Sequence, residues 1–340
     1  MQVTRTTSEA LEQFLIRSQE AVDAGTIRPS THRERARQLP RLLALQTEAG
    51  YCLGDLPYQE VTRRHVVSVL TMFARTPNLP QQGRRLDDGT RAIREGGLPA
   101  AATIRNARSY LGAFFRDRDD AYELDRRNPT HGIDLSTISG RRPEREPKFL
   151  DLDQVTALIA SVPENWRPIV TLLAYTGMRS GEARGLRWRD VDLDARVANV
   201  IGQADERGGW AAEVKTRHSQ REVGLPRIVV EALREQWKVT GQGEFVFGTK
   251  RGLRPDTNSN LRRAIHVGCE RAGLPLIGVH ALRASFILNA DERGMKVVVI
   301  SQTVGHHSTD FTQRRYMKAK VSLDRKLREL DAAFDGEEES

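Results

Sequence analysis

The sequence predicts a mainly α-helical protein of two units, with a small antiparallel β-sheet in the second unit. Three observations support this prediction. Apolar residues recur at helical spacing up to about residue 127, strand-like runs fall within 197–225, and a stretch rich in glycine, proline and arginine separates the two regions. At 340 residues the chain is long enough for two domains that each bury a core. We place the boundary near residue 145.

Residues 1–127 are predicted to form an all-α unit. Helical spacing is found in three groups of apolar residues: Leu11, Phe14 and Leu15; Val66, Val67, Leu70 and Phe73; and Leu111, Phe114 and Phe115. Residues 76–99 contain three prolines and four glycines. This segment is therefore predicted to be a long polar loop that interrupts the helices.

Two connecting or terminal segments flank the second unit, which we place at 148–320. Residues 128–147 combine glycine, proline and arginine and are predicted to be an extended basic linker. Residues 321–340 begin with apolar residues at helical spacing and end in an acidic stretch. We expect a short C-terminal helix followed by an acidic tail.

The second unit is predicted to begin with two helices. Asp151 and Gln154 have the spacing of a capping box, ahead of an apolar run. A further helix is expected at about 166–175, and Gly177 is a candidate for its left-handed end. The chain would then turn just before Arg179.

Strands and further helices are predicted to follow. Residues 197–201 and 213–225 contain strand-like stretches and are expected to pair in an antiparallel sheet, with Lys215 on a hairpin. Apolar residues at helical spacing predict helices after His280 and before Gly305. Tyr316 is expected on a third, shorter helix or its flanking loop.

Charge and composition limit the class of protein. The net charge is +8, and the last ten residues carry five acids and no Lys or Arg, so the rest of the chain is more basic still. This favours a polyanionic partner whose binding weakens with salt. The N-terminus lacks the apolar run of a signal peptide, and the two cysteines are too far apart in sequence to suggest a disulfide framework or a zinc site. We expect a cytoplasmic protein without a membrane span.

Five motifs carry residues suited to phosphoryl chemistry. They contain, in chain order, Arg179, Lys215, His280 with Arg283, His306, and Tyr316. Each has an ordinary structural alternative: Arg179 and Lys215 could be surface cations, and Tyr316 a packing residue. Glu182 could favour a helix N-terminus or orient Arg179 through a salt bridge. The order and spacing of the whole set favour a catalytic site.

The chemistry of such a site follows from the residue types. Arg179 and Arg283 can present paired donors to phosphate oxygens, and a cationic pocket favours the ionised form of Tyr316 as the nucleophile. Lys215 could protonate the leaving 5′ oxygen, and the histidines at 280 and 306 could assist proton movement. Because side chains supply this charge, we expect neither a metal nor another cofactor.

The motifs resemble those of the tyrosine recombinases, the phage-integrase family. The resemblance lies in TGMRSGEARGLRWRDVD at 176–192, KTRHSQREVGLP at 215–226, HALR at 280–283, and Gly305-His306 followed by Tyr316. His306 is preferred to His307 because it follows Gly305. The match spans about 150–320; the first unit matches loosely, through residues 102–106 and 128–129.

The resemblance implies a two-domain DNA clamp made of a helical, SAM-like core-binding domain and a catalytic domain. It also implies that Tyr316 forms a 3′-phosphotyrosine link, with the other five residues activating the scissile phosphate. The implied role is site-specific recombination, by an integrase of a mobile element or a chromosome-resolving, Xer-like enzyme. A non-cleaving DNA-binding regulator of the same fold and a type IB-like topoisomerase are the alternatives.

The expected partner is double-stranded DNA carrying recombination sites, with the protein assembled as a homotetramer and located at the nucleoid. An accessory DNA-bending protein is an optional further partner. The C-terminal helix could dock on a neighbouring protomer or pack on its own chain. Candidate DNA contacts are Arg105, Arg108, Arg141, Arg142, Lys148, Arg217, Arg254 and Arg262.

Overall fold

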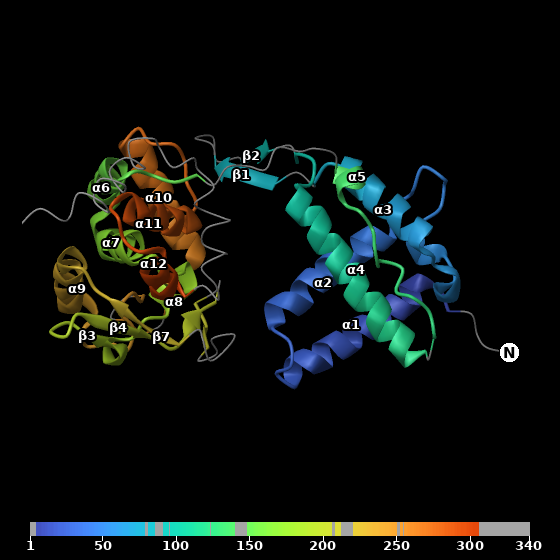
Figure 1. Ribbon diagram of the computed structural model, residues 1–340, viewed down its shortest axis with the longest axis horizontal. Helices are drawn as coiled ribbons and strands as arrows, with labels where there is room; N and C mark the ends of the chain where they lie inside the picture. The colour runs from blue at the N-terminus through green and yellow to red at the C-terminus, as the bar shows by residue number, and fades with distance from the viewer. Residues whose placement is uncertain are drawn as a thin grey trace, which may run out of the picture. The chain divides into compact units, whose positions relative to one another are not determined.

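The protein is described from a computed structural model. The described residues are 5–78, 81–85, 91–94, 96–122, 124–139, 148–205, 208–211, 220–249, 252–253 and 255–305. The chain divides into two compact units, residues 1–145 and 146–340, which Figure 1 labels by their helices and strands. Residues 128–139 of the predicted linker are part of the first unit, since Ile133 is buried in its core and residues 136–139 form a short helix. Residues 140–147 lie outside the described part of the chain, so the linker there stays a prediction.

The first unit is built mainly from helices. They are α1 (Thr7–Asp23), α2 (Pro29–Leu43), α3 (Arg63–Arg75), α4 (Ala101–Ala121) and the short α5 (Ser136–Ser139), with 3-10 turns at Leu53–Asp55 and Tyr58–Glu60. A capping box formed by Thr6 and Glu9 starts α1. Aromatic rings of Phe14, Tyr58 and Phe114 meet edge to face in the core. The predicted helical character of this unit is confirmed.

A buried polar cluster ties the 3-10 turn of Tyr58 to α4 and to the segment after it. The Tyr58 hydroxyl donates to Asp119 Oδ1 at 2.8 Å, and Asp119 also pairs with Arg126 at 2.9 Å. Arg126 Nη1 donates to the carbonyls of Tyr58, Gln59 and Val61. The side chain of Arg126 therefore fixes the chain as it leaves α4.

The prediction that the first unit contains no strands is wrong. Within the expected loop, β1 (Gln81–Arg85) pairs antiparallel with β2 (Arg91–Arg94), and the register shifts between Gln82 and Arg85. The two strands are made mostly of Gln, Gly and Arg, so they lack the alternation of apolar and polar residues that marks a half-buried strand. Backbone pairing does not need that pattern, and sequence reasoning missed it for this reason.

Seven helices are described in the second unit. They are α6 (Leu152–Ser161), α7 (Arg167–Thr176), α8 (Ser180–Arg184), α9 (Arg227–Thr240), α10 (Asn258–Arg271), α11 (Val279–Glu292) and α12 (Val297–Val304), with 3-10 turns at Glu164–Trp166 and Trp188–Asp190. Asp151 caps α6 as predicted. The buried helix α7 packs against α6, α8, α9 and α11 and forms the centre of the unit (Figure 1).

A small antiparallel sheet lies beside these helices. Its order is β3 (Val191–Asp192), β4 (Val197–Val200) and β7 (Arg221–Gly224), and a second pair is formed by β5 (Gln203–Ala204) and β6 (Trp210–Ala211). Ala198, Val200 and Val223 are buried and belong to the main core of this unit. The predicted pairing of the two strand-like stretches is confirmed.

None of the helices within the described ranges combines the length and the apolar character required to cross a lipid bilayer.

Candidate active site

Arg179 is positioned by a sharp turn between α7 and α8. Gly177 ends α7 in the left-handed conformation, with φ of 63°, as the sequence predicted. A Cβ at this position would come within 2.5 Å of Phe286 Cδ1 and 2.8 Å of Val304 Cγ1. Glycine is therefore required for both conformation and space, and the turn brings Arg179 to the start of α8.

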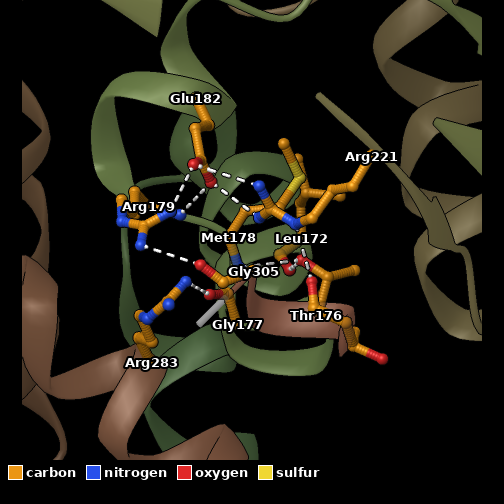
Figure 2. Close-up of polar contacts among 10 residues, drawn as sticks. Leu172, Thr176, Gly177, Met178, Arg179, Glu182, Arg221, Arg283 and Gly305 are labelled. Carbon is orange, nitrogen blue, oxygen red and sulfur yellow. Dashed lines mark hydrogen bonds and ion pairs between the residues drawn. The ribbon is translucent and has the colours of Figure 1, made fainter. Parts of the chain in front are cut away.

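Glu182 holds Arg179 in place and also binds a second arginine. Its carboxylate accepts hydrogen bonds from the backbone N–H and Nη1 of Arg179, each at 2.8 Å. The same carboxylate accepts from Arg221 Nη1 at 3.2 Å and Nη2 at 2.8 Å (Figure 2). The two alternatives considered for Glu182 are thus both realised, because it lies in the first turn of α8 and forms an ion pair with Arg179.

The ionisation of Glu182 is set by these two arginines. Burial by itself raises the pKa of the carboxyl, since only 2% of the side chain is exposed. Hydrogen bonds and charge from Arg221, followed by the charge and backbone N–H of Arg179, outweigh burial and lower the pKa of Glu182 to about 2. The residue is a carboxylate throughout the physiological range.

Arg283 reaches the same turn from α11. Its side chain is buried, and Nη1 donates to the Gly177 carbonyl at 2.7 Å (Figure 2). The two arginines singled out by the sequence therefore meet at one turn, Arg179 following it and Arg283 bonded to its backbone. The side chain of Arg179 is 42% exposed, so part of its guanidinium is accessible to a ligand.

The end of α12 joins the cluster through its backbone. Arg179 Nη2 donates to the Gly305 carbonyl at 3.2 Å, and Arg221 Nε donates to the Thr303 carbonyl at 2.9 Å. Gly305 ends α12 with φ of 68°. Gly305 therefore lies at the point where Arg179 and Arg221 bind the end of α12, and His306 is the next residue in the sequence.

The remaining expected catalytic residues differ in how far the structure describes them. His280 lies in the first turn of α11 and is exposed. Lys215, His306 and Tyr316 lie outside the described residues. The structure thus unites Arg179, Arg283 and the backbone leading to His306, and the placement of the other residues stays a prediction.

Sequence reasoning missed Arg221. Arg221 stands in a strand-like run and in the 215–226 motif, but the sequence predicts no role for it, since an arginine on a strand ordinarily faces solvent. The side chain is 8% exposed and lies between Glu182 and Thr303. The sequence did carry one signal for the burial of Arg221. Residues two apart on a strand point to the same side of a sheet, so Arg221 faces the same side as Val223, which is buried in the core.

A further buried arginine, Arg184, supports α8 from the side of β5. Arg184 Nη1 donates to the carbonyls of Asp205 and Asp256, both at 2.8 Å. Ser180, at the start of α8, donates to Asn258 Oδ1 at 2.6 Å. These contacts tie the helix that follows Arg179 to the β5 strand and to the start of α10.

The candidate DNA contacts fall into three groups. Arg105 on α4 and Arg262 on α10 are exposed. Arg108 is half-buried and donates to the Ile133 carbonyl, and Lys148 donates to the Leu276 carbonyl. The other four, Arg141, Arg142, Arg217 and Arg254, lie outside the described residues.

The sequence of this chain is similar to a protein-family model and to curated proteins. The model of the phage integrase family matches residues 148–322, which is more than half of the chain. The tyrosine recombinase XerC-like protein of Caldanaerobacter subterraneus subsp. tengcongensis is 26% identical over 245 residues, covering 64% of this chain and 62% of that protein. A putative prophage phiRv2 integrase of Mycobacterium tuberculosis is 29% identical over 206 residues, or 58% of this chain and 54% of the relative.

A solved structure extends the similarity to the whole fold. The Tn1549 transposon integrase, in complex with a circular intermediate DNA, is similar with a TM-score of 0.70 at 19% identity, over 97% of this chain and 99% of that one. The match to the family model shows that this chain belongs to the phage integrase family. This chain spans less than two thirds of the length of each of the two curated relatives named above.

Proposed function

We propose that this protein is a site-specific DNA recombinase that cleaves and rejoins DNA through a 3′-phosphotyrosine intermediate. The observation that carries the proposal is the meeting of Arg179 and Arg283 at the Gly177 turn, beside the backbone of Gly305. Guanidiniums from two separate motifs meet at one turn, and that of Arg179 also binds the Gly305 carbonyl, just before His306 in the sequence. Such an arrangement suits a group that carries negative charge on several oxygens.

In the proposed reaction the Tyr316 phenol passes its proton to a histidine of the site, its oxygen attacks the scissile phosphorus, and the bond to the 5′ oxygen breaks. Lys215 donates a proton to that oxygen, which leaves as a 5′-hydroxyl. Arg179 and Arg283 stabilise the charge on the non-bridging oxygens, and His280 and His306 bind the phosphate and assist proton movement. A 5′-hydroxyl then attacks the phosphotyrosine, restoring the phosphodiester and the free phenol, so no external energy source is consumed.

The proposed partner is double-stranded DNA, bound by both units. We propose that exposed arginines such as Arg105 and Arg262 contact phosphates, and that the protein works as a homotetramer on two sites at the nucleoid. The biological role would be integration of a mobile element or Xer-like resolution. Binding of DNA should weaken steeply as salt is raised, since phosphate contacts release counterions.

The test is the trapping of a covalent adduct. A pool of end-labelled duplexes with a randomised core, each nicked near the cleavage position, is incubated with wild-type protein and with Tyr316→Phe. We expect label to migrate with the wild-type polypeptide on a denaturing gel and not with the variant. Equal labelling of both proteins, or of neither, would refute the proposed mechanism.

A second assay separates recombination from relaxation. Duplexes recovered from the adducts are placed once or twice in a supercoiled plasmid. Exchange products from the two-site plasmid support a recombinase, whereas relaxation of both plasmids without exchange indicates a topoisomerase.

A further inference from the structure

Arg221 is a strand residue whose side chain is buried inside the site. Two of its nitrogens bind the Glu182 carboxylate and the third binds the Thr303 carbonyl. Its side chain is 8% exposed, against 42% for Arg179. Because each of its three side-chain nitrogens already donates to Glu182 or Thr303, we do not expect Arg221 to bind a DNA phosphate itself, and any effect on the reaction must pass through its neighbours.

Arg221 acts on Arg179 through the balance of charge around Glu182. One carboxylate, on Glu182, lies between two guanidiniums, so the three side chains together carry one net positive charge. The buried Arg221 forms the two-pronged contact with Glu182, and the exposed Arg179 carries the excess charge. Without Arg221 the carboxylate would balance Arg179, and the accessible guanidinium would attract a phosphate less strongly.

Arg221 also holds the end of α12 through contacts with its backbone. Thr303 lies in the last turn of α12, and its carbonyl accepts from Arg221 Nε at 2.9 Å. Gly305 passes so close to the guanidinium that a Cβ there would lie 3.1 Å from Arg221 Nε. The same side chain therefore fixes both the residue that pairs with Arg179 and the end of the helix from which His306 follows.

We propose that Arg221 is a positioning residue for strand cleavage, which neutralises Glu182 so that the charge of Arg179 is available to the scissile phosphate, and which holds the end of α12. This inference rests on the proposed recombinase function and adds to it a residue on β7. It predicts that Arg221 affects the rate of cleavage more than the binding of DNA, and that its effect depends on the charge of Glu182.

The test compares rates of covalent adduct formation in single turnover, with protein in excess over the nicked duplexes recovered from wild-type adducts. The variants are Arg221→Met, which removes the charge and keeps an unbranched side chain, Arg221→Lys, and the double variant Arg221→Met with Glu182→Gln. The matched control is Arg187→Met, because Arg187 is equally buried but pairs with Asp190 and Glu244 instead. Melting temperatures report folding, and filter binding reports DNA affinity.

We expect Arg221→Met to form the adduct about 100-fold more slowly than wild type, because small displacements of positioned groups have effects of this size. The double variant should be about tenfold faster than Arg221→Met, since removal of the carboxylate frees the charge of Arg179. Arg187→Met should melt at a lower temperature yet cleave at a rate close to wild type.

Several results would overturn the inference. A wild-type rate for Arg221→Met would refute positioning, and a double variant no faster than Arg221→Met would refute the role of charge. If Arg221→Met does not fold, Arg221→Lys is the test of positioning: it keeps the charge but loses the two-pronged contact with Glu182 and the Nε contact with Thr303, so a wild-type rate would refute the proposal that these contacts position the site. Failure of the wild-type protein to form any adduct would instead refute the recombinase function, and this inference with it.

Discussion

Replacement of Glu182 by Gln is expected to lower the stability of the second unit by an amount that depends on pH. The carboxylate is buried between Arg179 and Arg221 and accepts four hydrogen bonds from their N–H groups. Gln keeps the shape and one acceptor oxygen but not the charge. The stability difference between wild type and variant should therefore follow the ionisation of Glu182.

The size of the effect follows from the pKa of Glu182, which is lowered from 4.5 to about 2 in the folded protein. At about 1.4 kcal/mol per pKa unit, this shift corresponds to about 3 kcal/mol of stability. Because the pKa is lower in the folded state, that stability is fully present above pH 4.5. It is lost as pH falls from 4.5 towards 2, and about half should remain at pH 3.

The assay is urea unfolding at pH 7, 5, 4 and 3, followed by tryptophan fluorescence. It reports on the second unit alone, because that unit holds all the tryptophans, Trp166, Trp188, Trp210 and Trp237. Glu235→Gln is the control, since Glu235 forms an exposed ion pair with Lys238. A difference between wild type and Glu182→Gln that stays constant from pH 7 to pH 3 would show that packing, and not ionisation, accounts for the loss.

Two further predictions concern the turn before Arg179 and the first unit. Gly177→Ala should destabilise the second unit by about 1 to 3 kcal/mol through backbone strain alone, and by more because the added carbon clashes with Phe286. Gly224→Ala is the control and should change stability little, because no heavy atom lies within 4 Å of the added carbon. Equal unfolding midpoints for the two variants would contradict the prediction. Tyr58→Phe should destabilise the first unit by about 1 to 3 kcal/mol, because Asp119 loses the buried hydrogen bond from the Tyr58 hydroxyl. The loss of stability is measured by far-UV circular dichroism during thermal unfolding. An unchanged transition of the first unit would show that this hydrogen bond adds no stability.

Local features of the second unit were predictable from the sequence. The Asp151 cap and the left-handed end at Gly177 each depend on residues close together in the chain, whose conformational preferences act over a few positions. The strands β4 and β7 were predictable because each run has its own local strand preference, although the two lie far apart in the sequence. The hairpin of β1 and β2 was missed because its residues lack an apolar alternation. The backbones of β1 and β2 pair even though their residue types show no strand pattern.

The candidate site was predictable in part. The motifs named Arg179 and Arg283, and the structure brings both to one turn. Glu182 had two alternative roles in the sequence, and only the folded chain shows that it has both.

By itself, the sequence determined the helical character of both units, the ends of several helices and the residue types suited to phosphoryl chemistry, since these follow from short-range preferences and from the chemistry of each side chain. Only the tertiary structure decided that Arg221 shares Glu182 with Arg179 and binds the end of α12. The physical reason is that burial and ion pairing depend on which distant segments meet. The alternation with Val223 indicates which side of the strand Arg221 faces, but no local pattern records which acceptors it meets there.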